Sequence, residues 1–228
     1  MRICVVIPTL NEARAIADIV KNIRQQNLDV LVIDDGSTDN THRAAADNGA
    51  VVIKSLRNEG KGASLIKGFD YALKNNYDAV ITMDGDGQHL AEEIPYFVRV
   101  ADTSNSDILV GNRMTKKRNM PLIRVFTNKF MSWFISWLCK QKIPDSQCGF
   151  RLIKRWVLEK ISLSTRKYEI ESELLIKAAR VGAKIESVGI RSVYSGERSA
   201  INPFVDTFRF FRYILSEFGK QPKKTKAE

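Results

Sequence analysis

The sequence predicts an α/β protein in which a mostly parallel sheet is covered by helices on both faces. Apolar, strand-like runs alternate with helix-like segments through the first half of the chain. These runs are almost continuously apolar, which is typical of strands that are buried on both faces. The length of 228 residues and the hydrophobic content of 44% suit one large domain or a domain with an appendage.

The elements of the first half can be assigned in order. We expect strands at residues 3–8, 30–33, 51–54 and 77–83. Asn11 can cap a helix from about Glu12 to Gln26, and Gly49 can end a short helix after the second strand. A third helix is expected after Gly62, because apolar residues recur there at helical spacing. These residues are Ala63, Ile66, Phe69, Ala72 and Leu73.

Residues 121–140 predict an amphipathic helix with an unusually broad apolar face. Polar residues recur every four positions and form one stripe, which consists of Arg124, Asn128, Ser132 and Ser136. The remaining positions are mostly apolar and include Trp133 and Trp137. The charges of Arg124 and Lys129 argue against a spanning helix, so the pattern favours a helix that lies in a membrane interface. Burial in the protein core or in a dimer interface is the alternative.

The C-terminal part predicts a second amphipathic helix and a basic tail. Asn202 and Pro203 can start this helix, which spans about residues 203–219 and ends at Gly219. Its apolar stripe suits core packing and membrane contact equally. Residues 220–228 are basic and contain no large apolar residue that could dock them, so we expect disorder there.

Charge and cysteine content restrict the class of protein. The formal charge of +10 can attract nucleic acid, an anionic membrane or phosphorylated substrates. A nucleic-acid-binding protein is therefore an alternative of a different class, although no recognition motif supports it. The three cysteines, without a CxxC pair, indicate neither a disulfide framework nor a zinc site. A reduced, cytoplasmic compartment is the expected location, since residues 3–10 are typical of a first strand rather than of a signal peptide.

The turn Asp84-Gly85-Asp86-Gly87-Gln88-His89 follows the fourth predicted strand. Two carboxylates one residue apart at the end of a buried strand can hold a divalent cation against phosphate oxygens. An EF-hand loop is excluded, because His89 and Pro95 stand where it needs Gly and Glu. Neither GxGxxG after the first strand nor a P-loop is present. A solvated Asp-Gly turn is the plain alternative.

Other strand ends and later segments give the chain a resemblance to a known family. The strand ends are Pro8-Thr9-Leu10-Asn11-Glu12 and Asp34-Asp35-Gly36-Ser37-Thr38-Asp39, and the later segments are residues 111–113, 145–151 and 196–204. From Ile3 to Ile214 the chain resembles a family 2 glycosyltransferase of the GT-A fold, in the dolichyl- or polyprenyl-phosphate mannose synthase and glucosyltransferase branch. The resemblance implies a Rossmann-like, three-layer α/β/α domain over residues 1–219. Residues 1–90 would bind the nucleotide and residues 91–219 the acceptor.

The resemblance implies a donor site for a nucleotide-diphosphate sugar. Donor contacts are expected from Pro8, Leu10, Glu12, Ile33, Asp35, Lys61, Asp84, Gly85 and Asp86. Asp35 would bond the base, while Asp84 and Asp86 would hold Mg²⁺ or Mn²⁺ with a contribution from Gln88. The ion would stabilise the leaving diphosphate as a Lewis acid. Direct attack from the opposite face would invert the sugar carbon.

The acceptor implied by this branch is a polyprenyl phosphate, which arrives already charged and needs cations rather than a base. The expected acceptor residues are Arg113, Arg124, Asn128 and Arg198, and the expected catalytic residues are Asp86, Arg113, Arg124 and Asp145. Asp145 would orient the acceptor loop or bind sugar hydroxyls. In the alternative, a family 2 enzyme that acts on a sugar hydroxyl, Asp145 would be the base. A nucleotidyltransferase is a third candidate.

The resemblance also implies partners and a location. The donor would be UDP-glucose, with a slight preference, or GDP-mannose, and nucleic acid would not be a partner. The enzyme would lie at the cytoplasmic face of the membrane, either peripherally or through an integral membrane partner or a second copy. Two explanations fit the acidic segment Glu169 to Leu175 equally well: a solvated helix face, or a match of Glu173 to an acidic position of the family. We expect Cys148 to have a packing role and His89 to lie near the metal.

Overall fold

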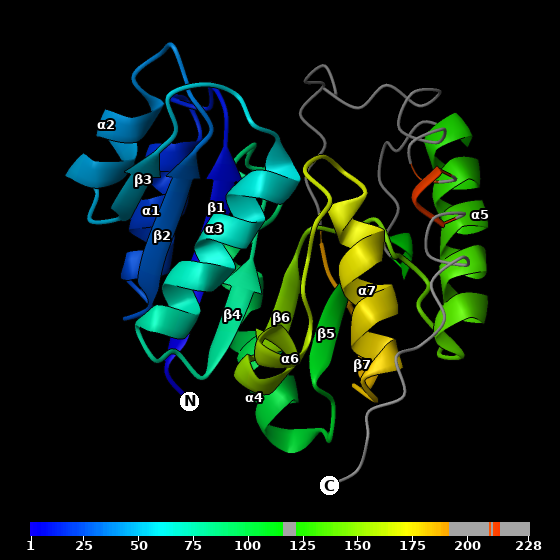
Figure 1. Ribbon diagram of the computed structural model, residues 1–228. Helices are drawn as coiled ribbons and strands as arrows, with labels where there is room; N and C mark the ends of the chain where they lie inside the picture. Colours follow the sequence, from blue (N-terminus) through cyan, green and yellow to red (C-terminus); the bar gives the residue numbers. More distant parts are fainter. Residues whose placement is uncertain (116–121, 192–209, 211, 215–228) are drawn as a thin grey trace, which may run out of the picture. The chain divides into compact units, whose positions relative to one another are not determined.

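A computed structural model describes residues 1–115, 122–191, 210 and 212–214 (Figure 1). A seven-stranded sheet in the order β3-β2-β1-β4-β6-β5-β7 forms its centre. The strands are β1 (Ile3–Thr9), β2 (Asp29–Asp34), β3 (Val51–Lys54), β4 (Ala79–Thr82), β5 (Ile108–Asn112), β6 (Arg151–Lys154) and β7 (Ile185–Gly189). Within this sheet β6 alone is antiparallel to its neighbours, β4 and β5. The predicted, mostly parallel sheet is confirmed.

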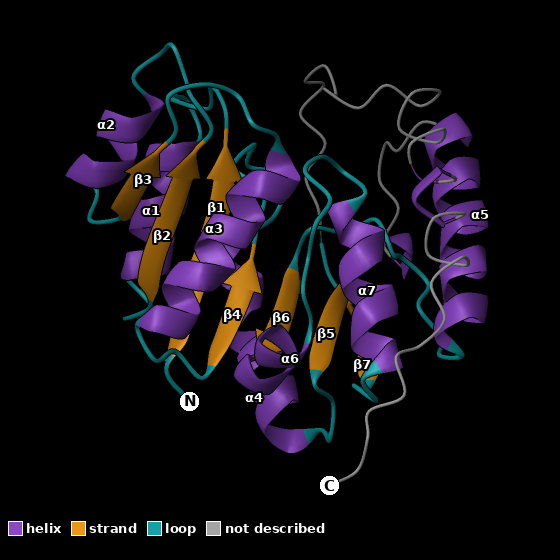
Figure 2. Cartoon of the chain, viewed as in Figure 1, coloured by secondary structure: helices purple, strands orange, loops and turns teal. Residues whose placement is uncertain are grey.

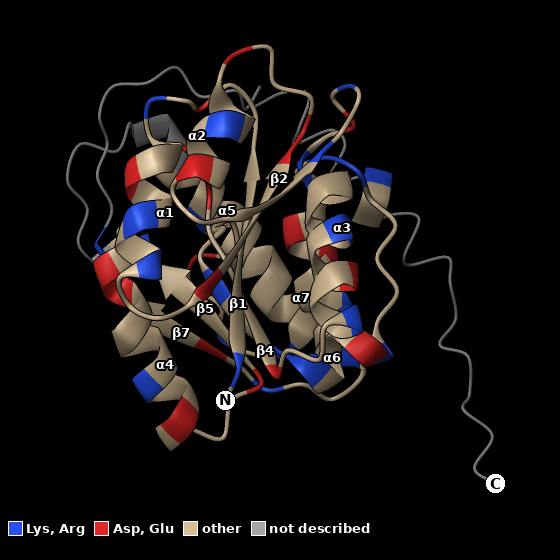
Figure 3. Ribbon diagram, turned by 90° about the vertical axis from the view of Figure 1, so that its left-hand side faces the viewer, with Lys and Arg blue, Asp and Glu red and all other residues tan. Residues whose placement is uncertain are grey.

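Helices cover both faces of the sheet. They are α1 (Ile16–Arg24), α2 (Thr41–Asp47), α3 (Lys61–Lys74), α4 (Ile94–Thr103), α5 (Leu122–Cys139), α6 (Arg155–Lys160) and α7 (Ile170–Arg180), with short 3-10 turns η1 (Ala91–Glu93) and η2 (Arg113–Thr115). Helices α3, α6 and α7 lie on one face, and α1 and α4 on the other (Figures 1 and 3). The arrangement is a three-layer α/β/α sandwich of the GT-A type.

Burial explains why β1 and β2 form where the sequence predicts them. All seven residues of β1 are buried, as are five of the six residues of β2. The predicted strand at residues 51–54 is found with those bounds. The predicted strand at residues 77–83 is shorter, since only Ala79–Thr82 pair as a strand. Gly49 has a φ of 93° after α2, as expected for a glycine that ends a helix.

The predicted start of the first helix is wrong. This helix begins at Ile16 rather than at Glu12, and it ends at Arg24. Asn11 does not cap it, because Asn11 adopts a φ of 57° and its Oδ1 accepts a hydrogen bond from the Thr38 amide at 2.9 Å. Asn tolerates this left-handed conformation better than most residues. The side chain therefore joins two loops instead of closing a helix.

Helix α3 lies unusually close to the central strand. A Cβ atom placed on Gly68 would stand 2.3 Å from Cγ1 of Val6 in β1. Real side chains do not approach so closely, so only glycine fits at this point of the helix. This close contact fixes the position of α3, whose first residue is Lys61, against β1.

The C-terminal part falls into a second unit. Residues 1–196 form one compact unit and residues 197–228 another. Of the predicted helix at residues 203–219, Phe210 and residues 212–214 are described and are helical. The rest of that helix, Arg198 and the tail at residues 220–228 lie outside the described residues. The single domain over residues 1–219 stays a prediction.

All three cysteines, Cys4, Cys139 and Cys148, are free and buried. Burial raises the pKa of each thiol to about 12. Only a thiolate reacts readily, so we expect thiol reagents at pH 8 to label the native protein on the order of 1000-fold more slowly than an exposed cysteine. After unfolding in guanidinium, absorbance of released thionitrobenzoate should report three thiols per chain. A fast-reacting thiol in the native protein would contradict this burial.

The contact between Gly68 and Val6 predicts that the effect of a mutation at Gly68 on stability depends on the side chain at position 6. Gly68→Ala should destabilise the protein by about 1–3 kcal/mol, although alanine is the better helix former, because the new methyl group collides with Val6. Denaturant unfolding of Gly68→Ala, Val6→Ala and the double variant measures the coupling. The double variant should lose less stability than the two single losses combined, whereas strict additivity would show that the collision is not the cause.

Candidate functional site

Three parallel strands end at the same edge of the sheet (Figure 2). Thr9 pairs with Asp34 at the ends of β1 and β2, and Val6 pairs with Thr82, the last residue of β4. The loops that follow these strands therefore emerge side by side. Residues 8–12, 34–39 and 84–86 thus follow strand ends that lie at one edge of the sheet.

Hydrogen bonds between the first two loops hold them together. The Asp35 amide donates to the Thr9 carbonyl at 2.9 Å, and the Asn11 amide donates to Ser37 Oγ at 2.9 Å. The Glu12 amide donates to Thr41 Oγ1 at 2.8 Å. Loop amides need partners of this kind, and here the partners come from the end of β1, from the second loop and from the start of α2. These bonds hold the first two strand ends together.

Asp34 and Asp35 both brace the backbone. Asp34 Oδ1 accepts the Ser37 amide at 2.7 Å. Asp35 accepts the amides of Glu59 and Gly60, through different carboxylate oxygens, at 2.8 and 2.7 Å. A carboxylate has about four lone-pair sites, so these bonds leave capacity for a ligand. Asp35 thereby connects the second strand end to the start of α3.

The other residues predicted to contact the donor differ in exposure. Pro8 and Ile33 are buried in β1 and β2, whereas Leu10 is 37% exposed in the following loop. Among these three, Leu10 is the side chain that a ligand can reach in this conformation. Glu12 lies two residues further along the same loop and is partly buried.

The acidic turn is tightly packed against β1. A Cβ atom on Gly85 would stand 2.9 Å from Thr9 Oγ1, so this glycine is required by the protein's own packing. Asp86 Oδ1 accepts the Gln88 amide at 3.0 Å, and Gly87 between them has a φ of 75°. The turn is therefore an ordered structure rather than a solvated loop.

Asp84 is held by a cation. Its Oδ1 lies 2.5 Å from Nζ of Lys61, the first residue of α3. Burial alone would raise the pKa of Asp84, but the ammonium outweighs it and lowers this pKa to about 2. The carboxylate is ionised at neutral pH and already bears one positive partner.

His89 is a buried side chain that supports the acidic turn through a hydrogen bond. It is buried, and its Nδ1 accepts the Asp84 amide at 3.3 Å. Burial lowers the pKa of His89 to about 4, so the ring is neutral at pH 7 and fits the acceptor role. Its Nε2 lies 3.8 Å from Sγ of the buried Cys148. The raised pKa of this thiol agrees with the expected packing role, because no thiolate forms there.

The acidic turn could hold a divalent ion only with help from a ligand. Among the described residues, no group of three or more His, Cys, Asp and Glu side chains could hold a metal. Asp84, Asp86 and Gln88 would thus supply few ligands. Mg²⁺ commonly binds one or two carboxylates together with substrate phosphates, so this donor set fits an ion that arrives with a diphosphate.

Two glycines beside Lys61 are required by a loop of the protein. A Cβ atom on Gly60 or Gly62 would stand 2.4 Å from the backbone carbonyl oxygen of Arg166 or Thr165, respectively. The amides of Gly62 and Ala63 donate to the Arg166 carbonyl at 2.9 and 3.2 Å. The start of α3 is therefore covered by residues of the loop between α6 and α7.

Helix α7 contributes residues that sequence reasoning missed. Glu171 Oε1 lies 2.7 Å from Lys61 Nζ, and its Oε2 lies 2.6 Å from Nη2 of Arg151. All three side chains are mostly buried, so the solvated face, one of the two alternatives left open for Glu169–Leu175, is wrong. The helical spacing of Glu169, Glu171 and Glu173 gave no signal of these partners, because they come from distant parts of the chain.

Glu173 has a structural role. Its carboxylate accepts the amides of Ser164 and Thr165 at 3.0 and 2.8 Å and lies 2.6 Å from Lys177 Nζ. Burial opposes ionisation, but these bonds lower the pKa of Glu173. The side chain thus holds the loop that covers the start of α3.

Arg113 and Asp145 form a close pair after β5. Nε and Nη2 of Arg113 donate to the two carboxylate oxygens of Asp145 at 2.8 and 2.9 Å. The Arg113 amide donates to the same carboxylate at 3.1 Å. Asp145 is fully buried. The arginine is therefore fixed in one orientation.

The polar stripe of α5 faces the protein. Ser132 is 2% exposed and its Oγ accepts the Ser146 amide at 2.9 Å. Ser136 Oγ accepts the Ile143 amide at 3.0 Å. Asn128 is partly buried on the same stripe. The side chain of Arg124 lies outside the described residues, as does Arg198.

The opposite side of α5 exposes large aromatic residues. The exposed fractions are 72% for Phe126, 44% for Phe130, 65% for Trp133 and 61% for Trp137. We call these four residues the aromatic face. None of the helices in the described part of the chain has the length and hydropathy that a membrane span needs. Helix α5 thus buries Ser132, Ile135 and Cys139 on one side and exposes the aromatic face on the other.

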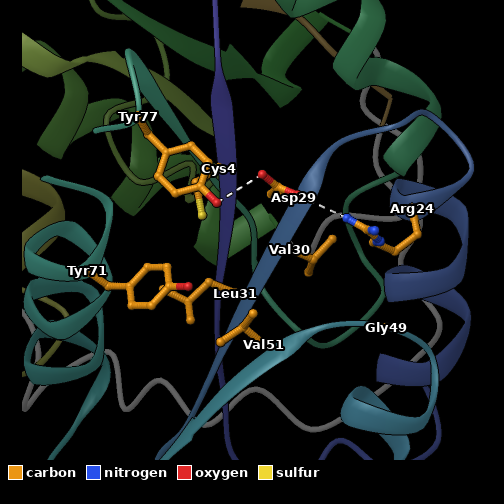
Figure 4. Close-up of a pocket in the computed structure, with 9 residues that line it drawn as sticks. All are labelled: Cys4, Arg24, Asp29, Val30, Leu31, Gly49, Val51, Tyr71 and Tyr77. Carbon is orange, nitrogen blue, oxygen red and sulfur yellow. Dashed lines mark hydrogen bonds and ion pairs between the residues drawn. The ribbon is translucent and has the colours of Figure 1, made fainter. Parts of the chain in front are cut away.

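A small cavity of about 170 Å³ lies away from this edge (Figure 4). Its lining includes Cys4, Asp29 and Val51, at or next to the starts of β1, β2 and β3, together with side chains of α1 and α3. Asp29 accepts a hydrogen bond from Tyr77 at 3.0 Å and pairs with Arg24 at 3.1 Å. These polar groups of the cavity lining bond to one another, and we assign the cavity no role.

Comparisons with known proteins agree with this geometry. The family model described as glycosyl transferase family 2 matches residues 4–162. An uncharacterised protein of Methanocaldococcus jannaschii is 32% identical over 85% of this chain and 82% of its own length. Polyprenol monophosphomannose synthase of Mycolicibacterium smegmatis is 32% identical over 83% of this chain and 76% of its own. UDP-N-acetylglucosamine--dolichyl-phosphate N-acetylglucosaminyltransferase of Methanococcus voltae is 28% identical over 96% and 97%.

Solved structures show the same fold. Glucosyl-3-phosphoglycerate synthase of Mycobacterium tuberculosis, in complex with Mn²⁺, UDP and glucosyl-3-phosphoglycerate, superposes with a TM-score of 0.74 at 20% identity. The match covers 97% of this chain and 81% of that one. The same enzyme was also crystallised with Mg²⁺ and UDP. On its sequence match and its fold, the chain belongs to glycosyl transferase family 2.

Proposed function

We propose that this enzyme transfers a hexose from a nucleotide-diphosphate sugar to a polyprenyl phosphate, with inversion, at the cytoplasmic face of a membrane. The observation that carries this proposal is the Arg113–Asp145 pair, which lies beyond β5 and leaves no accessible base at Asp145. Relatives named for transfer to polyprenol and dolichyl phosphate support the acceptor class.

The donor side rests on the acidic turn. Asp84 and Asp86, with Gln88, would hold Mg²⁺ or Mn²⁺ together with the donor's diphosphate, and the ion would stabilise the charge of the leaving group. The related fold that was crystallised with UDP and either metal supports this assignment. Lys61, at 2.5 Å from Asp84, would contact the same diphosphate.

The acceptor side distinguishes the two enzyme hypotheses. A base for a sugar hydroxyl must reach the acceptor and take up a proton. Asp145 has both oxygens bonded to Arg113 and no exposed surface, so protonation would break a buried ion pair. A phosphate nucleophile needs no base, and an arginine held in one orientation suits it. Arg124, Asn128 and Arg198 are the further proposed phosphate contacts.

The membrane association would use the aromatic face of α5. Tryptophan at a helix surface suits the headgroup region of a bilayer, and exposure of four large aromatic rings in water is otherwise costly. Lys116, Lys117 and Arg118 precede this helix in the sequence and would favour anionic lipid. The acceptor is itself a lipid, so one surface would both anchor the enzyme and meet its substrate. Peripheral attachment is therefore our proposal.

The identity of the donor sugar is proposed from the resemblance and is tested with a panel of donors. UDP-glucose and GDP-mannose are the proposed donors, and the relatives named for mannose and N-acetylglucosamine define the panel for a test.

Purified enzyme with radiolabelled UDP-glucose, GDP-mannose or UDP-N-acetylglucosamine and polyprenyl phosphate should place label in an acid-labile lipid only when Mg²⁺ or Mn²⁺ is present. Asp86→Asn should lower this rate by at least about 100-fold, because charge stabilisation of the leaving diphosphate is lost. Asp70→Asn, an exposed carboxylate on α3, is the matched control and should keep full activity. Label in a soluble sugar, and none in lipid, would refute the polyprenyl acceptor.

Sedimentation with vesicles tests the membrane surface. Trp133→Ser/Trp137→Ser should weaken binding to vesicles of phosphatidylcholine and phosphatidylglycerol by about 10-fold or more, since two apolar side chains no longer enter the bilayer. Leu56→Ser/Tyr96→Ser removes two other exposed apolar side chains and should bind like the wild type. If the tryptophan variant instead changes a dimer to a monomer in analytical ultracentrifugation, the face is a subunit interface and the proposal is wrong.

A further inference from the structure

One buried ammonium group joins the acidic turn to α7. Nζ of Lys61 lies 2.5 Å from Asp84 Oδ1 and 2.7 Å from Glu171 Oε1. The side chain of Lys61 is 17% exposed and that of Glu171 is 6% exposed. Together the two carboxylates raise the pKa of Lys61 against the effect of its burial. The lysine is therefore charged and shared between two acids.

Glu171 is held in place from its other side. Its Oε2 lies 2.6 Å from Nη2 of Arg151. Arg151 is itself fixed, because it donates to the carbonyls of Ser146, Cys148 and Glu171 at 2.8, 2.9 and 2.8 Å. Glu171 therefore cannot follow Lys61 if the lysine moves. It offers the ammonium a stationary partner.

The space around this ion pair is closed by a glycine. A Cβ atom on Gly149 would stand 2.7 Å from Asp84 Oδ2 and 3.0 Å from Lys61 Nζ. The Gly149 carbonyl accepts the Thr82 hydroxyl at 2.6 Å, which fixes this backbone to β4. Asp84 and Lys61 are thus confined against the chain, and a rearrangement there must exchange one partner for another.

A divalent cation on Asp84 would compete with Lys61 for the same carboxylate. An ammonium that lost its only partner in this partly buried place would be costly. Glu171 removes that cost, because Lys61 keeps one carboxylate while Asp84 turns to the metal. We propose that Glu171 is a positioning residue that acts through Lys61 and sets the metal affinity of the acidic turn. This inference rests on the proposed function.

The inference predicts a change in metal binding that needs no turnover. Electron paramagnetic resonance of free Mn²⁺, titrated with protein at saturating UDP, gives the Kd of the metal. Glu171→Gln should raise this Kd about 10-fold or more, as does the loss of other groups that support metal ligands. Glu159→Gln removes the carboxylate of a surface pair, at 2.7 Å from Arg155, and should leave the Kd unchanged.

A second background separates this role from a structural one. In Lys61→Met protein, Glu171→Gln should change the Mn²⁺ Kd by less than about 2-fold, because the residue through which Glu171 acts is gone. An equal effect of Glu171→Gln in both backgrounds would overturn the proposal, as would a wild-type Kd for Glu171→Gln itself.

Circular dichroism checks the fold of each variant. Should Glu171→Gln not fold, Glu171→Asp keeps the charge beside Arg151 but shortens the reach toward Lys61. It should also raise the Kd, and an unchanged Kd would overturn the inference. If the wild-type protein binds no Mn²⁺ in the presence of UDP, both this inference and the proposed function are overturned. If it binds Mn²⁺ but the Kd does not depend on Glu171, the inference alone is overturned.

Discussion

Carboxylates crowd the carboxyl edge of the sheet, and each must be compensated. Asp34 and Asp35 accept backbone amides, Asp84 and Glu171 share Lys61, and Asp145 pairs with Arg113. A partly buried charge without partners would be unstable, so these contacts dictate how the loops run. Asp84 is one of these groups and is also a metal ligand in the proposed function, so folding and the proposed metal binding would share this charge.

This compensation makes the edge rigid without a ligand. Gly85 of the acidic turn is required by Thr9, and Gly60 and Gly62 are required by the backbone of Thr165 and Arg166. Glycine in such loops is often taken as room for a ligand. In this protein, the chain's own atoms fill the space beside these glycines. The preorganised edge lowers the conformational entropy cost of binding.

Helix α5 illustrates how one pattern can lead to an unexpected arrangement. Its serines bond to residues 143 and 146, while its tryptophans remain exposed. A surface helix normally turns its apolar side inward. In α5, Ile135 and Cys139 do turn inward, but the four residues of the aromatic face stay exposed, which is consistent with a surface that a lipid would cover.

The sequence alone determined the four strands of the first half, the mostly parallel character of the sheet and the acidic turn, because alternation, apolar runs and turn residues are local signals. It misplaced the start of α1, since Asn11 bonds across to Thr38 instead of capping. Only the tertiary structure revealed Glu171 and Arg151 as members of the site and Glu173 as a loop support. The partner of a buried charge is chosen by proximity in space among distant segments, and no local pattern encodes that choice.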